Sequence, residues 1–131
     1  MIRPRVLLAD DHSAFLQGTT ALLKPQFEIV GTVADGAALV SEALRLHPDV
    51  IVADIAMPGL NGIAAARRLR LFDSSARIVF LTIHPEEQFV EACRAEGALG
   101  YVVKTHMKAH LIPAIQAALT GAAYISPLVP K

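Results

Sequence analysis

The sequence predicts an α/β fold of five βα units around a five-stranded parallel sheet. Short apolar runs of strand length recur along the chain, at residues 6–9, 29–33, 50–53, 78–81 and 99–103. Most of these runs are continuous rather than alternating, which is typical of strands that are covered on both faces. Segments with helical apolar spacing separate them, and parallel strands need such crossovers. The alternation therefore predicts a (βα)5 domain.

Each predicted strand is followed by a segment whose pattern predicts a helix. Apolar residues three or four positions apart fall within residues 15–23, 39–46, 63–70, 89–96 and 111–122. Glycine and proline mark the turns between elements, as at Asp35-Gly36, Pro48, Pro58-Gly59, Pro85 and Gly97. Pro113 lies inside the last segment, so that helix either starts late, with Pro113 in its first turn, or kinks.

The composition indicates one ordinary folded domain. The 131 residues are enough for one hydrophobic core, and 53% hydrophobic with 18% charged residues excludes a disordered segment. Twelve basic and twelve acidic side chains give no net charge, and no basic run stands out, so we do not expect these residues to bind DNA directly. The single cysteine, Cys93, favours a reducing compartment and a buried apolar role.

The ends of the chain predict neither a signal peptide nor a membrane span. The apolar run before Asp10 is too short for a signal peptide. Residues 109–130 lack Lys, Arg, Asp and Glu, but three prolines and several polar residues make them unsuitable as a lipid-facing helix. We therefore expect a cytoplasmic protein without a membrane partner, with one domain over residues 1–125. Residues 126–131 then form a tail or the start of a linker to an output domain outside this chain.

Polar residues with complementary chemistry follow four of the five predicted strands. Asp10 and Asp11 follow the first, Asp54 the third, Thr82 the fourth and Lys104 the fifth. Ligands of open α/β sheets bind beyond the carboxyl ends of the strands, so we expect these side chains to share one site. Helix capping and turn formation are the alternative roles for the aspartates.

Three neighbouring carboxylates favour a divalent cation with oxygen ligands, because the carboxylates otherwise repel one another. Mg²⁺ (or Mn²⁺) suits this set, whereas zinc does not, since we expect no His or Cys to join it. One carboxylate can serve as a nucleophile that takes up a phosphoryl group. A lysine ammonium and a threonine hydroxyl can then pair with the phosphoryl oxygens. The set predicts phosphoryl chemistry.

Four blocks of the sequence carry a family resemblance. They are Val6-Leu7-Leu8-Ala9-Asp10-Asp11-His12, Asp49 to Gly62 with Asp54 and Met57-Pro58-Gly59 inside it, Thr82, and Gly97 to Lys104. In this order and spacing the chain resembles a response-regulator receiver domain of the CheY-like type, over about residues 5–125. The resemblance implies a flavodoxin-like three-layer sandwich with strand order 2-1-3-4-5.

The resemblance also implies a role for each site residue. Asp54 accepts a phosphoryl group from a sensor histidine kinase, while Thr82 and Lys104 contact that group. Asp10 and Asp11 bind Mg²⁺ together with Asp54 and the backbone carbonyl of Ala56. Tyr101 matches the aromatic switch position, whose ring turns inward on activation and alters the surface of helix 4, strand 5 and helix 5. Such a protein phosphorylates and dephosphorylates itself but is not a metabolic enzyme.

Further motifs are similar to the NarL/FixJ (LuxR-type) subfamily. They are the Asp-Asp-His-Ser motif at residues 10–13, the absence of proline directly after Lys104, and the Tyr-Ile-Ser-Pro motif at residues 124–127. Members of this group usually carry a C-terminal DNA-binding domain, so we expect a role in transcription regulation through an output domain that is not in this chain. A homodimer through helix 4, strand 5 and helix 5, or through helix 1 and helix 5, is a further expectation.

Two other functions remain as alternatives. The first is a phosphorylation-independent interaction module (a pseudo-receiver) or a stand-alone receiver. The second, an aspartate-nucleophile phosphatase of the haloacid dehalogenase type, needs a second carboxylate two residues after Asp54, where Ala56 stands instead. We therefore set the phosphatase aside.

Several individual residues allow more than one interpretation. Ile83 stands where receivers usually carry a small residue, so it either narrows the path of water to the phosphoryl group or packs sideways. His106 and His110 are four residues apart, a spacing that suits either a zinc pair or an exposed turn. The arginines at positions 67, 68 and 70 form either a phosphate-binding patch or, more commonly, a solvated helix face. We expect His12 to be a loop or cap residue rather than a proton shuttle.

Overall fold

The computed structural model describes residues 2–73, 75–83 and 87–126. Its strands are β1 (Arg5–Ala9), β2 (Glu28–Val33), β3 (Val50–Ala53), β4 (Ile78–Thr82), β5 (Gly100–Val103) and β6 (Tyr124–Ile125). Its α-helices are α1 (Ser13–Leu23), α2 (Gly36–Leu46), α3 (Gly62–Phe72), α4 (Glu87–Ala95) and α5 (Met107–Leu119), with a short 3₁₀ turn, η1, at Lys104–His106. The five predicted βα units are all present.

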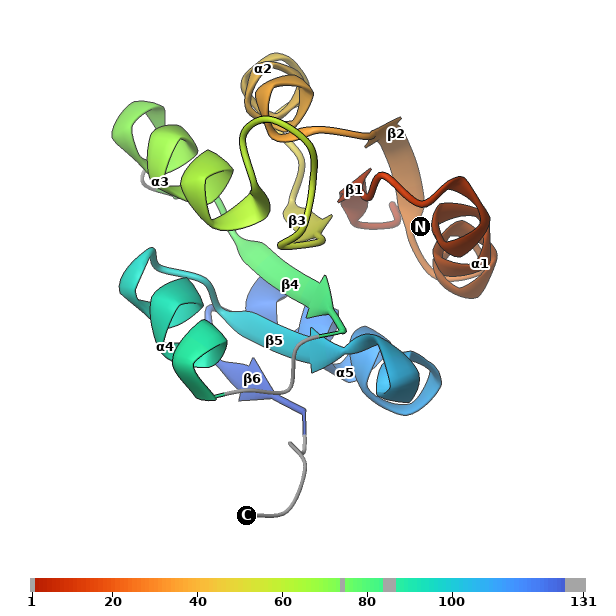
Figure 1. The fold of residues 1–131 in the computed structure, drawn as a ribbon. Helices are drawn as coiled ribbons and strands as arrows, with labels where there is room; N and C mark the ends of the chain where they lie inside the picture. Colours follow the sequence, from red (N-terminus) through yellow and green to blue (C-terminus); the bar gives the residue numbers. More distant parts are fainter. Residues whose placement is uncertain (1, 74, 84–86, 127–131) are drawn as a thin grey trace.

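The strands form one parallel sheet in the order β2-β1-β3-β4-β5-β6. Helices α1 and α5 lie on one face of this sheet, and α2, α3 and α4 lie on the other (Figure 1). The predicted three-layer α/β fold and the order 2-1-3-4-5 are therefore confirmed. The buried core is divided accordingly, with one apolar cluster on each side of the sheet.

The central strands have continuous apolar runs because helices cover both faces of the sheet. All four residues of β3 and all five of β4 are buried. Within β3, Ile51 packs on the side of α2, α3 and α4, whereas Val52 packs on the side of α1 and α5. Both faces of a central strand thus exclude water, so apolar residues occupy both sets of alternate positions over most of its length.

The sheet has a sixth strand that the sequence did not predict. The two-residue strand β6 pairs in parallel with the outer edge of β5 (Figure 1). Such a short segment carries no apolar periodicity of its own, because its position depends on backbone pairing with a distant strand. The prediction of five strands therefore holds for the core and misses this addition.

Pro113 lies in the interior of α5, six residues after the helix begins at Met107. The predicted late start, with Pro113 in the first turn, is therefore wrong. Proline has no amide hydrogen, so Pro113 cannot donate the helical hydrogen bond to the carbonyl of Ala109. The flanking residues Leu111, Ala114 and Ile115 are fully buried on the sheet, and their packing offsets that loss.

The start of α3 packs directly on the backbone that follows β3. A Cβ atom added at Gly62 would lie 2.1 Å from the carbonyl oxygen of Asp54, a distance that no side chain can occupy. The amide of Gly62 donates a hydrogen bond of 2.8 Å to the carbonyl of Ile55. Asn61 caps the helix, since its side chain accepts a hydrogen bond from the amide of Ala64. These contacts hold the loop after Asp54 in place.

None of the helices in the described ranges combines the length and the apolar character that crossing a membrane requires.

Candidate functional site

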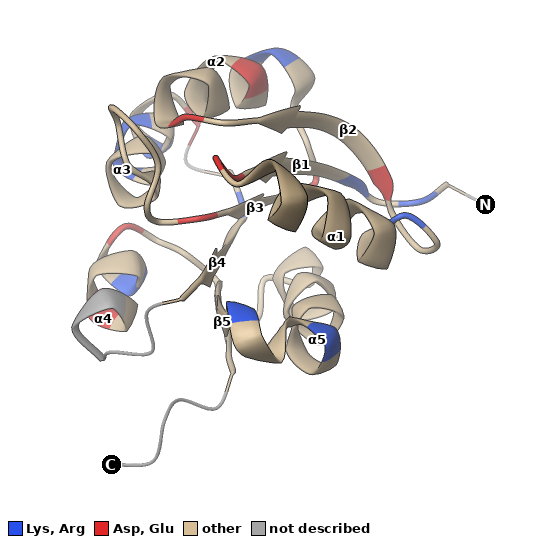
Figure 2. Cartoon of the chain, turned by 45° about the vertical axis from the view of Figure 1, so that its right-hand side comes forward, with Lys and Arg blue, Asp and Glu red and all other residues tan. Residues whose placement is uncertain are grey.

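The residues predicted to share a site lie together at one edge of the sheet. Asp10 follows β1, Asp54 follows β3, Thr82 ends β4, and Lys104 follows β5. Figure 2 shows acidic segments after β1 and β3 and a basic segment between β5 and α5. All strands are parallel, so their carboxyl ends meet there, and the topological rule correctly locates the site.

The ammonium of Lys104 bridges the two buried aspartates. Its Nζ lies 2.8 Å from Oδ2 of Asp10 and 3.1 Å from Oδ2 of Asp54, and it donates a hydrogen bond to each. The three side chains are only 7%, 6% and 4% exposed. A buried charge of this kind needs partners, and here one cation lies between two anions.

Phe15, on the first turn of α1, contacts the same lysine. The Nζ atom of Lys104 lies 4.2 Å from the centre of the Phe15 ring, within cation–π distance. The apolar spacing assigned Phe15 to the first predicted helix and gave no signal for its contact with Lys104. Lys104 is therefore held by two carboxylates and an aromatic face.

Burial raises the pKa of the Asp54 carboxyl, and the nearby negative charge of Asp10 raises it further. The charge and hydrogen bond of Lys104, together with a hydrogen bond of 3.2 Å from the amide of Ala56, act in the opposite direction. A desolvated carboxylate that keeps one oxygen next to a lysine is a more reactive nucleophile than one in water.

Asp11 and His12 complete the acidic cluster on its solvent side. Carboxylate or imidazole atoms of Asp10, Asp11, His12 and Asp54 all lie within 4.8 Å of one another. The Nδ1 atom of His12 is 3.3 Å from Oδ1 of Asp10 and 3.2 Å from Oδ1 of Asp11. The expectation that no histidine joins the cluster is therefore wrong. An exposed loop residue gives no sequence signal for such proximity.

His12 is also the N-cap residue of α1, although its side chain makes no capping hydrogen bond. Its position at the cap agrees with the expected loop or cap role, and the alternative in which Asp11 caps this helix is wrong.

The donor set fits a hard divalent cation. Asp10, Asp11 and Asp54 supply carboxylate oxygens from two neighbouring strand ends, and magnesium prefers oxygen ligands. The protein contributes one positive charge to this cluster through Lys104, which leaves the carboxylates in excess. The predicted acidic pocket for Mg²⁺ is therefore present in the fold.

Thr82 and Tyr101 are both buried, at 0% and 2% exposure. Thr82 ends β4 at the edge where Asp54 lies, and Tyr101 lies on β5 three residues before Lys104. Because Tyr101 is buried, its ring is already directed inward in this structure.

Ile83, directly after β4, is 65% exposed, so its side chain points largely into solvent.

The remaining candidate groups are used elsewhere in the fold. Nε of Arg67 donates a hydrogen bond of 2.9 Å to Oε2 of Glu96, and Arg70 donates one of 3.0 Å to the carbonyl of Ala95. These two arginines therefore join α3 to the end of α4 rather than forming a patch free for phosphate. His110 contacts Tyr124 at 2.6 Å, and neither His106 nor His110 joins a metal-binding group of three among the described residues.

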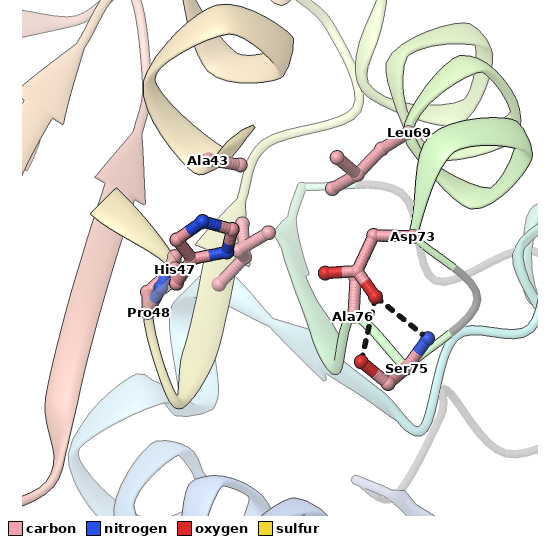
Figure 3. Close-up of a pocket in the computed structure, with 8 residues that line it drawn as sticks. Ala43, His47, Pro48, Leu69, Asp73, Ser75 and Ala76 are labelled. Carbon is pink, nitrogen blue, oxygen red and sulfur yellow. Dashed lines mark hydrogen bonds between the residues drawn. The ribbon is translucent and has the colours of Figure 1, made fainter. Parts of the chain in front are cut away.

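A separate cavity of about 180 Å³ lies between the ends of α2 and α3 (Figure 3). It is lined by His47, Asp73 and Ser75 among others, and Asp73 accepts hydrogen bonds from the amide and the hydroxyl of Ser75. Several of its lining residues, such as Pro48 and Ala76, directly precede β3 or β4, so the cavity is at the opposite edge of the sheet from Asp54. Its described lining residues include no lysine and a single carboxylate, a set that does not suit phosphoryl chemistry.

A comparison with known families agrees with this arrangement. The model of the response regulator receiver domain matches residues 6–116. The chain is a response-regulator receiver domain. Receiver domains accept a phosphoryl group on an aspartate, and they bind Mg²⁺ at an acidic pocket of the kind described above.

Individual relatives place this receiver domain in the predicted NarL/FixJ (LuxR-type) subfamily. It is 35% identical to the transcriptional regulatory protein DegU of Brevibacillus brevis, over 95% of this chain and 54% of that protein. It is 38% identical to LiaR of Bacillus subtilis strain 168, over 89% of this chain and 56% of that protein. The receiver thus spans little more than half the length of these curated relatives.

Solved structures agree with both the fold and the subfamily. A LuxR-family two-component response regulator from Aurantimonas sp. SI85-9A1 matches with a TM-score of 0.91 and 35% identity, covering 95% of this chain and 91% of that one. The receiver domain of the putative response regulator NarL from Mycobacterium tuberculosis matches with a TM-score of 0.87 and 28% identity, covering 92% and 99%.

Proposed function

We propose that Asp54 is the residue of this receiver that accepts a phosphoryl group from the phosphohistidine of a sensor histidine kinase. The single observation that carries this assignment is the position of its carboxylate, buried at the carboxyl end of β3 and hydrogen-bonded to Lys104. Asp10 shares that lysine but follows β1, where Asp11 and His12 extend the cluster toward solvent.

The reaction is a displacement at phosphorus. The carboxylate oxygen of Asp54 forms a bond to the phosphorus atom while the phosphorus–nitrogen bond of phosphohistidine breaks, and the imidazole leaves with the electron pair. The product is an acyl phosphate. Lys104, whose ammonium already lies 3.1 Å from Asp54, pairs with a phosphoryl oxygen, and Thr82 contributes its hydroxyl from the end of β4. Attack of water on the acyl phosphate reverses the modification.

Asp10, Asp11, Asp54 and the carbonyl of Ala56 are the proposed ligands of Mg²⁺ (or Mn²⁺). The bound ion supplies positive charge that offsets the carboxylates and the phosphoryl oxygens. The excess of carboxylates over Lys104 in this cluster supports the assignment.

Phosphorylation then changes what the domain binds. Thr82 and Tyr101 are the proposed switch residues, because both are buried on the neighbouring strands β4 and β5, which end at the site. In the longer regulator to which residues 1–125 would belong, residues 126–131 begin the linker to a DNA-binding domain that controls transcription in the cytoplasm. The names of DegU and LiaR as transcriptional regulatory proteins support this output. Dimerisation through α4, β5 and α5, or through α1 and α5, is the proposed means by which phosphorylation affects the DNA-binding domain.

A small phosphodonor with Mg²⁺ tests this function without knowledge of the kinase. We expect acetyl phosphate to add one phosphoryl group to the wild-type protein, as measured by intact mass, and to add none to Asp54→Asn. Asp49→Asn is the matched control, because Asp49 precedes the same strand at the opposite edge of the sheet. A wild-type protein that never gains a phosphoryl group would instead support the pseudo-receiver alternative.

A further inference from the structure

The last described segment of the chain is attached to the outer edge of β5. Strand β6 pairs with β5 so that Tyr124 is opposite Gly100 and Ile125 is opposite Tyr101. The amide of Tyr124 donates a hydrogen bond of 2.8 Å to the carbonyl of Leu99, and the amide of Ser126 donates one of 2.9 Å to the carbonyl of Tyr101. Segment 124–126 therefore pairs with backbone carbonyls of β5 and of the residue before it, which at an open sheet edge would be free to bind another chain.

Ser126 connects this segment to the strand end that carries Lys104. Its side chain is buried, with 1% of the residue exposed, and its hydroxyl oxygen accepts a hydrogen bond of 3.1 Å from the amide of Val103. Val103 directly precedes Lys104, whose ammonium contacts Asp54. Val103 contacts Ser126, and its neighbour Lys104 contacts Asp54, so these two adjacent residues connect the proposed phosphorylation site to Ser126.

Two further contacts hold segment 124–126 in place. The hydroxyl of Tyr124 lies 2.6 Å from Nδ1 of His110 on α5. Ile125 and Tyr101 line the same hollow of about 120 Å³, together with Val90 and Cys93 of α4. The segment therefore contacts β5 and α5 and shares a hollow with α4, and these are the elements whose surface a receiver is expected to change.

We propose that segment 124–126 is a latch, held by the Ser126 hydroxyl on Val103, that tightens when Asp54 is phosphorylated. The proposal rests on the proposed phosphorylation of Asp54. A phosphoryl group adds about two negative charges next to the Lys104 ammonium, so Lys104 and the end of β5 are held more firmly. The amide of Val103 then keeps its hydrogen bond to Ser126 for a larger fraction of the time. Ser126 acts as a positioning residue, since it reaches the site only through the backbone.

Because coupling between two sites is reciprocal, a tightened latch must in turn favour the phosphorylated domain. Loss of the latch should therefore lower the phosphorylated fraction reached with a given concentration of phosphodonor. If Ser126 only supported the fold, its substitution would not lower the phosphorylated fraction in a variant whose unfolding midpoint is unchanged.

Amide hydrogen exchange in the full chain, with and without acetyl phosphate and Mg²⁺, measures the latch directly. We expect phosphorylation to slow exchange at the amides of Tyr124 and Ser126 about threefold or more in the wild type. Without phosphodonor, Ser126→Ala should speed exchange at the amide of Val103 about tenfold, because this buried donor loses its acceptor. Ser41→Ala, at an exposed position on α2, is the matched control and should leave these rates unchanged.

The phosphorylated fraction, measured by intact mass, supplies the second readout. We expect it to fall in Ser126→Ala and to stay at the wild-type level in Ser41→Ala. Phosphorylated wild-type protein with unchanged exchange at Tyr124 and Ser126, or an equal phosphorylated fraction in Ser126→Ala, would overturn the latch alone. A wild-type protein without any phosphoryl group would overturn both the latch coupling and the proposed function.

Discussion

Lys104 Nζ lies 3.1 Å from Oδ2 of Asp54, at a site where both side chains are more than nine-tenths buried. The same ammonium lies 2.8 Å from Asp10, so one cation offsets two buried anions. Removal of Lys104 leaves the two buried carboxylates without their shared cationic partner, a change that is more costly than loss of a surface ion pair.

We expect Lys104→Met to lower the free energy of unfolding by about 3 kcal/mol at pH 7. Denaturation by urea at pH 7 and pH 4 measures the effect, and the loss should shrink at the lower pH because the Asp54 carboxyl, whose pKa is raised, takes up a proton. Lys108→Met, at an exposed position on α5, should change stability by less than about 0.5 kcal/mol. An equal loss for Lys104→Met at both pH values would show that packing, and not charge, is responsible.

The raised pKa of Asp54 predicts a specific pH dependence. Burial favours the protonated carboxyl in the folded state, so the folded protein binds this proton more tightly than the unfolded chain does. The resulting stabilisation is fully present below the ordinary pKa of 3.8 and is lost as the pH rises through the higher pKa of the folded state.

Because asparagine does not ionise, Asp54→Asn removes this loss of stability at higher pH. We therefore expect the variant to be more stable than the wild type at pH 7 and to lose this advantage as the pH falls toward 4, with urea midpoints as the measurement. Glu28→Gln, at an exposed position on β2, serves as the control and should show no such trend. A variant that is less stable than the wild type at pH 7 would show that the Lys104 contact outweighs the burial of the carboxylate.

Gly62 and Gly18 provide a matched pair of substitutions. A Cβ atom at Gly62 would lie 2.1 Å from the carbonyl oxygen of Asp54, whereas one at Gly18, inside α1, would meet no atom within 4 Å. We expect Gly62→Ala to lower the free energy of unfolding by about 2 kcal/mol or more, through displacement of backbone at the site. Gly18→Ala should raise it by about 1 kcal/mol through helix propensity. Thermal unfolding of both variants checks the prediction, and a neutral Gly62→Ala would contradict it.

Pro113 predicts a stabilising substitution. In Pro113→Ala the helix regains an amide that can donate to the carbonyl of Ala109, at an exposed position of α5. We expect a gain of about 2 kcal/mol in the free energy of unfolding, because recovery of the hydrogen bond exceeds the entropy that proline removes from the unfolded chain. Gln116→Ala, exposed on the same helix, should change stability by less than about 0.5 kcal/mol in the same denaturant titration. A loss in Pro113→Ala would mean that the proline ring itself packs favourably.

The sequence was sufficient for the five core strands and the main site because both depend on rules that act locally or through topology. The continuous apolar runs mark strands buried on two faces, and parallel order then brings Asp10, Asp54 and Lys104 to one edge. The family resemblance added the expected role of each residue.

The features that the sequence missed depend on contacts between distant or exposed residues. Arg67 and Glu96 are 29 positions apart, and their pairing follows only from how α3 and α4 pack. His12 joins the acidic cluster because its ring lies against Asp10 and Asp11, and β6 exists only because its backbone pairs with β5. No periodicity or propensity encodes these relationships.

We propose that Asp54, and no other carboxylate of the cluster, carries the phosphoryl group. Peptide mass mapping after treatment with acetyl phosphate and Mg²⁺, with the acyl phosphate trapped by reduction, tests it most directly. We predict that the modified site is Asp54 in the wild type and that no other residue takes its place in Asp54→Asn. Modification of Asp10 or Asp11 in the wild-type protein would contradict the assignment.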